Sequence, residues 1–156
     1  MDLNLKDCLK IGATGLSGLF AGCTLYVNAA GHPAGQTLDL PNCRKDWKEN
    51  FLRARKIQRP MAVLGALAGA GAYYLDKDSD TRSLWLVGSS IFICVWPWTV
   101  IVMLPDIKKN LQDDVIKTAG ETWVKNHIIR WNKQHGVKTF LSCTAFGIFL
   151  YALSRK

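Results

Sequence analysis

Trp123, His127 and Arg130 are the residues of this 156-residue chain whose types and spacing point most directly to chemistry. Spacings of four and three, at about 100° per residue, place them on one face of a helix, within roughly 60° of each other. An imidazole can act as a general base near neutral pH, and a guanidinium can hold an oxyanion. The same pattern also fits a helix that lies on lipid headgroups, with the indole buried and the arginine on phosphate.

His32 is the second candidate base. It follows an apolar stretch, and Pro33 is expected to end that helix and to hold the imidazole near the membrane surface. An even number of membrane spans between His32 and His127 would bring both to one side, where Trp98 and the segment 53–58 also end. We therefore expect a pocket suited to removing a proton from an acidic carbon or a phenol. Two histidines without a nearby carboxylate cluster do not predict a metal site.

The elements that must position these residues are four apolar stretches, at 11–30, 61–75, 84–104 and 137–153. The first and third are about 20 residues long, enough to cross a hydrocarbon core about 30 Å thick. The second and fourth are shorter and need flanking Arg59, Lys138, Arg155 and Lys156 to reach the headgroups. We predict an all-α fold, a single four-span membrane domain over residues 1–156. It is a four-helix transmembrane bundle with an additional amphipathic helix in the third loop, at 108–134. The alternative is a soluble four-helix bundle with very apolar helices.

The distribution of lysine and arginine predicts an orientation. The two long loops, 31–59 and 105–136, hold 14 of the 20 basic residues when the edge residue Lys138 is included. The positive-inside rule then places both long loops in the cytoplasm and both termini in a lumen or outside the cell. We interpret the net charge of +8 as a topology signal. Nucleic-acid binding is not supported, because no basic cluster is interleaved with stacking aromatic residues.

Three further patterns bear on processing, redox chemistry and packing. Residues 1–22 form a poor signal peptide, because Asp2 and Asp7 accompany the two lysines, so we expect an uncleaved first span. The five cysteines include no C-x-x-C pair, which gives no support to a thioredoxin-like motif or a zinc knuckle. Glycines at 12, 15, 18, 22, 65, 69 and 71 allow close helix approach, which favours packing within the bundle over a homo-oligomer seam.

An ordered set of short motifs runs from about Thr14 to Arg130: Gly15–Ser17, Ala21–Gly22, Tyr26–Pro33, Arg53–Ala54 with Gln58, Pro97–Thr99, Val102–Pro105, and Trp123-x-x-x-His127-x-x-Arg130. In this set the chain resembles the DUF1772 family, which includes the anthrone oxygenases. The resemblance implies a small four-helix membrane protein. For members of assigned activity it implies oxidation of an anthrone to an anthraquinone by O2, without flavin, haem or added metal. Gly31 and Gly35 stand where members often have Glu and Arg, and Ile107 stands where they tend to have Asn.

Carried over to this sequence, the resemblance implies that His127 or His32 removes a proton from the doubly benzylic carbon. The anion passes an electron to O2, and loss of water from the peroxide gives the quinone. The implied catalytic residues are His127, His32 and Arg130, and the implied substrate contacts are Trp123, Trp98, Asn28, Arg53 and Gln58. Arg130 and Asn28 would hold the phenolate, and the two indoles would stack on the rings.

Two other functions fit the same spans. A non-catalytic membrane scaffold or assembly protein would have no pocket. A haem- or quinone-binding bundle would use His32 and His127 as ligands, and a Soret band would reveal haem. The expected partners are the lipid bilayer, an aromatic small molecule with O2 if the protein is an enzyme, no nucleic acid, and a second copy of the chain if it forms a homo-oligomer.

Overall fold

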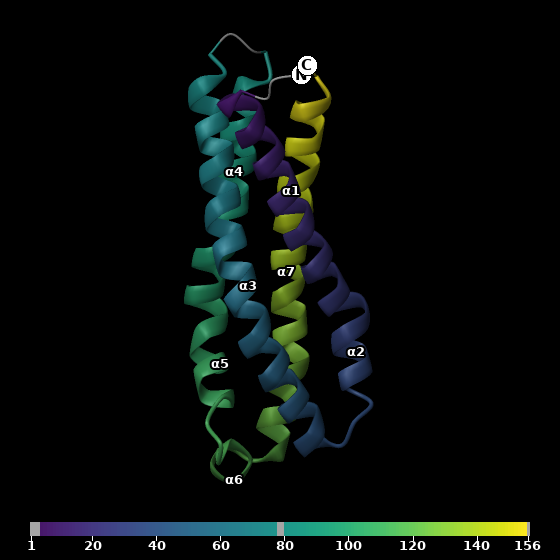
Figure 1. The fold of residues 1–156 in the computed structure, drawn as a ribbon. Coiled ribbons are helices and arrows are strands. Elements are labelled where there is room, and N and C mark those ends of the chain that lie inside the picture. The colour runs from purple at the N-terminus through teal and green to yellow at the C-terminus, as the bar shows by residue number, and fades with distance from the viewer. Residues whose placement is uncertain (1–3, 78–79, 156) are drawn as a thin grey trace.

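Four long helical rods run up and down side by side (Figure 1) in the computed structural model, which describes residues 4–77 and 80–155. The first rod contains α1 (Leu5–Tyr26), the π-helical segment η1 (Val27–Gly31) and α2 (His32–Gly35). The second rod is α3 (Leu40–Leu75). The third contains α4 (Arg82–Trp98), the π-helical segment η2 (Thr99–Met103) and α5 (Leu104–Asn110). The fourth is α7 (Glu121–Ser154), preceded by the short α6 (Val115–Ala119). The described residues contain no strand.

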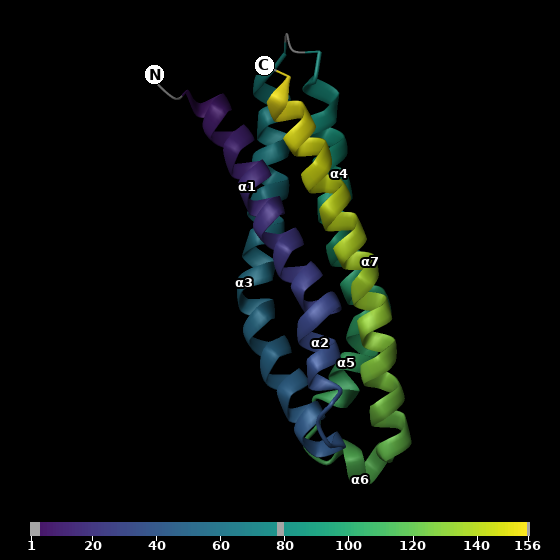
Figure 2. The same cartoon turned by 90° about the vertical axis from the view of Figure 1, so that its right-hand side faces the viewer.

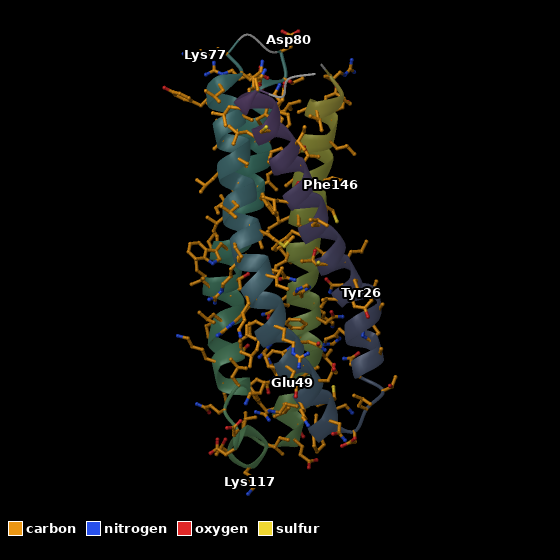
Figure 3. All side chains as sticks on the ribbon, in the orientation of Figure 1. Tyr26, Glu49, Lys77, Asp80, Lys117 and Phe146 are labelled. Atoms are coloured by element: carbon orange, nitrogen blue, oxygen red, sulfur yellow. The ribbon has the colours of Figure 1, made fainter. Side chains whose placement is uncertain are left out.

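The bundle has an apolar half toward one end and a polar half toward the other. α1 begins and α7 ends at one end (Figure 2), near the labelled Lys77 and Asp80, and α6 with Lys117 lies at the other (Figure 3). We call residues 5–26, 61–75, 82–98 and 137–154 the apolar half, and residues 27–60 and 99–136 the polar half. Asp2 and Lys156, which the sequence places beside the first and fourth apolar stretches, lie outside the described residues.

The predicted helix at 108–134 is wrong. α5 ends at Asn110, and α7 starts at Glu121 and runs without interruption into the fourth apolar stretch. Gly120 explains the break, because its φ of +84° and ψ of 153° are open essentially to glycine alone. The predicted long loop at 31–59 is likewise mostly helical, since α3 starts at Leu40. Charged residues in both segments cover the outside of a longer bundle instead of forming loops.

Pro33 does not end the first helix, contrary to the prediction from its residue type. The rod continues through α2 to Gly35, with Pro33 in the first turn of α2, where its missing N–H has no helical partner to lose. A π-helical segment precedes Pro33, and a second one precedes Pro105 in the third rod. Widened turns of this kind let a rod pass a proline without ending.

Three of the four rods are long and apolar enough to cross a membrane: 5–35, 82–110 and 121–154. The remaining rod, α3, is long enough. Charged residues precede its short apolar stretch at 61–75, however, so it does not qualify as a candidate span. This differs from the four spans that the sequence predicts, of which the second, at 61–75, is one of the two shorter ones. At 1.5 Å per residue, rods of 34 and 36 residues measure about 50 Å, which exceeds a hydrocarbon core of about 30 Å.

The apolar half is packed through small residues against aromatic rings. Phe20 meets Phe92 edge to face at 5.3 Å, and Trp85 stacks on Phe149 at 5.5 Å. A Cβ added to Gly88 would lie 2.5 Å from the Phe149 ring. Gly18, Gly65 and Gly69 are similarly close to neighbouring rods, whereas a Cβ added to Gly15 or Gly22 would have no neighbouring atom within 4 Å. The expected packing within the bundle is therefore found at Gly18, Gly65 and Gly69. It is also found at Gly71, where a Cβ would lie 3.1 Å from Leu9, and more loosely at Gly12, where a Cβ would lie 4.0 Å from Ala68.

Candidate functional site

A partly open cleft of about 600 Å³ lies in the polar half and reaches the boundary of the apolar half. All four rods line it, with His32 from the first, Trp47 and Gln58 from α3, Met103 from η2, and Trp131, His135 and Lys138 from α7. Both π-helical segments contribute to the wall. Local π-helical turns often mark functional sites, and the volume lies in the range of small-molecule pockets.

His32 lines the cleft and keeps one ring nitrogen without a hydrogen-bond partner among the described residues. The imidazole is buried, and its Nε2 lies 3.0 Å from the carbonyl oxygen of Ile128. Because a carbonyl only accepts, Nε2 donates the hydrogen and Nδ1 of the neutral ring keeps a lone pair. Nδ1 is buried and has no hydrogen-bond partner among the described residues. The ring also stacks on Trp131 at 5.6 Å, so the backbone and the indole both fix its orientation.

His135 is a second histidine of the cleft, and the sequence motifs did not single it out. Its Nδ1 lies 3.0 Å from Oδ1 of Asn28. The amide nitrogen of Asn28 donates to the backbone and side-chain oxygens of Asn132, each at 2.8 Å, so Oδ1 is the acceptor that remains. Nδ1 of the neutral His135 ring therefore carries the hydrogen, and Nε2 keeps the lone pair. Asn28, predicted to contact substrate, orients this ring instead and does not line the cleft.

A column of side chains along α7 contains His127 and His135, and its Trp131 also contacts His32. Trp123, His127, Trp131, His135 and Thr139 follow one another at intervals of four residues, which places them on one stripe of the helix. Trp131 lies 4.8 Å from His135 and meets Trp47 of α3 edge to face at 5.7 Å. This strict spacing was the sequence signal that could have revealed His135.

His127 is part of the column but does not line the cleft. As the spacing predicts, it stacks on Trp123, with ring centres 5.2 Å apart. Trp47 covers its edge at 5.4 Å, and only 1% of the residue is exposed. Neither ring nitrogen has a hydrogen-bond partner among the described residues. His127 is therefore enclosed among indoles.

Arg130 and Trp98 also lie away from the cleft. Arg130 is exposed and binds the Asp106 carboxylate at 2.6 Å, and the indole of Trp98 donates to the carbonyl oxygen of Gln134 at 3.1 Å. Of the eight residues predicted for the site, the cleft wall contains His32, Arg53 and Gln58, and does not contain His127, Arg130, Trp123, Trp98 or Asn28.

The charged groups of the cleft are mostly basic. Among the described residues of the wall, Asp46 is the one acidic side chain, and it accepts a hydrogen bond from Asn50 at 2.9 Å. Its carboxylate lies within electrostatic range of His32, beside Gly35, whose missing side chain leaves room for it. Burial, together with the Asp46 and Asp39 carboxylates, raises the pKa of the Cys43 thiol, so this wall residue stays protonated and is a poor nucleophile.

The donor set does not point to a metal centre. No three His, Cys, Asp or Glu side chains within 4–77 and 80–155 are grouped so that they could hold a metal ion. The cleft instead combines two imidazoles, three indoles and a basic rim. Such a wall suits a flat aromatic ligand with an acidic proton.

Comparisons with known proteins place the chain in a family. A family model described as anthrone oxygenase matches residues 47–148, more than half of the chain. The matched region includes Trp47, Trp131, His135 and Lys138, whereas His32 precedes it. No curated protein and no solved structure matches the chain. The protein belongs to the anthrone oxygenase family, formerly known as DUF1772.

Proposed function

We propose that this protein oxidises a hydroxylated polycyclic phenol of the anthrone type to the corresponding quinone, with O2 as the oxidant and the cleft as the site. The observation that carries the proposal is Nδ1 of His32, which has no hydrogen-bond partner among the described residues and belongs to a side chain that lines an aromatic cleft of about 600 Å³. Membership of the anthrone oxygenase family supports the same reaction. A scaffold protein has no need of such a cleft.

The first step is removal of a proton. His32 accepts it through Nδ1 from the methylene carbon that lies between two aryl rings, and the negative charge spreads to the ketone oxygen on the opposite side of the central ring. Because the lone pair already resides on Nδ1, the ring needs no change of tautomer. The nearby Asp46 carboxylate stabilises the imidazolium that forms.

O2 then oxidises the carbanion. One electron passes to O2, the resulting superoxide and carbon radical combine into a C–O bond, and the peroxide takes back the proton from His32. Loss of the second hydrogen on that carbon, with cleavage of the O–O bond, releases one water molecule and leaves a carbonyl group. One anthrone and one O2 therefore give one quinone and one water.

The aromatic walls have a role in binding. Trp47 and Trp131 line the cleft, and their indole nitrogens are buried without a hydrogen-bond partner among the described residues. Stacking on these rings orients a flat substrate, and the two N–H groups are donors for its oxygen atoms. His32 and His127 do not face each other across the cleft, which disfavours their use as a pair of haem ligands.

The membrane arrangement belongs to the same proposal. The apolar half would sit in the bilayer with four crossing rods, α3 included, and the polar half would extend into the cytoplasm. The excess of Lys and Arg in the polar half supports this orientation. The cleft would then open near the membrane surface, where a lipophilic phenol and O2 both concentrate.

The test uses the purified protein in lipid vesicles, with 1,8-dihydroxyanthrone as the probe. O2 uptake and quinone absorbance are recorded together against protein-free vesicles. We expect quinone to form faster than the spontaneous background, with one O2 consumed for each quinone. A rate equal to that of protein-free vesicles contradicts the proposal.

A further inference from the structure

Lys138 is a cation on the wall of the cleft, and the groups around its ammonium are neutral. Its Nζ lies 3.4 Å from Oε1 of Gln58 and 5.8 Å from the centre of the Phe20 ring. It forms no ion pair with a carboxylate among the described residues, although it lies where the apolar stretch of α7 begins. An ammonium group in such surroundings is costly unless a counter-charge is present.

The other basic residues of the wall are placed differently. Arg53 is exposed and pairs with Glu49 at 3.4 Å, and Arg55 lies over the Phe51 ring at 5.9 Å. Arg59 is exposed on α3. Arg130, which the sequence suggested for an oxyanion, is occupied by Asp106 outside the cleft. Within 4–77 and 80–155, Lys138 and Arg55 are the two cationic side chains that combine cleft lining, partial burial and freedom from a carboxylate. Of the two, Lys138 is the one that lies at the start of an apolar stretch.

Lys138 also has a suitable position relative to the bases. It follows His135 by three residues, which places both on the same face of α7. His135 and His32 both pack on Trp131. His32 packs on Trp131 and is held by the carbonyl of Ile128, whereas Lys138 lies ten residues further along α7 than Ile128, so the base and the ammonium group lie at different levels of the cleft.

We propose that Lys138 binds the oxyanion of the ligand, which is an aromatic ketone with an acidic hydroxyl group beside its carbonyl. This inference rests on the proposed function and adds the group that holds the charge produced when His32 removes a proton. In such a ring system the carbonyl and the methylene lie on opposite edges of the central ring. A base and a cation at different levels of the cleft match that arrangement.

The probe is 1,8-dihydroxyanthraquinone, whose colour changes from yellow to red when a hydroxyl group ionises. Its visible spectrum in the presence of excess protein is recorded as a function of pH for wild type and Lys138→Met. The other titratable or charged groups on the described wall are Tyr26 and His32 from the first rod, His135 from α7, and Cys43, Asp46 and three arginines from α3, with none from the third rod. All of these remain in the variant, so the difference between the two curves reports Lys138.

We expect the bound quinone to ionise at least tenfold more readily in wild type than in Lys138→Met, a shift of about one pH unit. Lys138→Arg should keep the shift, because it keeps the charge. Lys133→Met is the matched control, since Lys133 is an exposed lysine of the same helix that does not line the cleft. Methionine is apolar and suits the apolar stretch, so Lys138→Met should fold.

The outcomes separate the two proposals. Equal ionisation of the quinone in wild type and Lys138→Met contradicts the assignment of Lys138 while leaving the oxidation of anthrones untouched. If wild type fails to bind the quinone at all, neither proposal survives. Loss of the shift in Lys133→Met as well as in Lys138→Met also contradicts the assignment, because the effect would then not depend on the cleft.

Discussion

Hydrogen bonding divides the three histidines of the bundle into two kinds. His32 and His135 each have one ring nitrogen held by an oxygen acceptor, which leaves the other nitrogen as a base. His127 has no partner for either nitrogen among the described residues and packs between Trp123 and Trp47. The residue type is the same, but the surroundings hold one nitrogen of each of the first two rings and enclose the third ring among indoles.

His127→Phe tests this division through stability. Phenylalanine retains a flat ring between the indoles and removes two buried polar atoms that have no partners in the described part of the chain. We expect the free energy of unfolding to stay the same or to rise by about 1 kcal/mol, as when an unpaired polar group is replaced by an apolar one of similar shape. Thermal unfolding in detergent measures the effect. A loss of several kcal/mol would show that the ring nitrogens make essential hydrogen bonds.

Residue types alone could identify part of the site. His32, Arg53 and Gln58 are predicted from the sequence and line the cleft. Arg130 is predicted because it shares a helix face with His127, but Asp106, from another rod, draws its side chain to the surface. Spacing along one helix does not reveal such a partner. His135 and Lys138 were missed as site residues because their roles depend on Asn28, Gln58 and Trp131, which come from three different rods.

At the scale of elements, the two π-helical segments contribute to the wall of the cleft. η1 and η2 belong to different rods, and both line it. Each is followed by a proline, whose ring disfavours a regular α-helical turn before it. A following proline does not by itself account for the widened turns, because α3 passes Pro60 and α4 passes Pro97 without a π-helical segment before them.

Close packing in the apolar half fixes how the rods lie against one another. Gly88→Ala should be destabilising by about 1–3 kcal/mol, because a Cβ there would lie 2.5 Å from the buried Phe149 ring, which stacks on Trp85. Gly147→Ala is the matched control. A Cβ there would have no neighbouring atom within 4 Å among the described residues, so helix propensity should make it neutral or stabilising by up to about 1 kcal/mol. Equal melting temperatures for the two variants would contradict this packing.

The apolar stretches predicted helices, and helices occupy all four of them. The polar segments were harder, because runs of charge such as Arg44–Lys45 are typical of loops. In the folded chain Lys45 is exposed on α3, Arg44 donates to the carbonyl oxygens of Asn110 and Gln112, and Trp47 and Cys43 are buried. In α3 and in α7 a polar segment and an apolar stretch belong to one helix, and no residue in the sequence marks the point where one passes into the other. The structure shows that each is a single rod.

The whole molecule combines a bundle longer than a bilayer is thick with a cleft in its polar half. The three rods that meet the criteria for a membrane span bring their apolar residues to one end, and α3 packs among them. The cleft lies toward the polar end and is lined by all four rods. Its walls depend on the entire bundle, so the site and the fold cannot be separated.

The central claim is that chemistry takes place in this cleft with His32 as the base. The most direct test is the initial rate of quinone formation from 1,8-dihydroxyanthrone, measured for wild type, His32→Gln and His127→Phe in the same vesicles. Binding of 1,8-dihydroxyanthraquinone confirms that each variant retains a folded cleft. We predict that His32→Gln lowers the enzymatic rate by about 100-fold or more, since general bases contribute at least that much, while His127→Phe stays within a few-fold of wild type. A His32→Gln protein that binds the quinone and oxidises the anthrone at the wild-type rate would contradict the account.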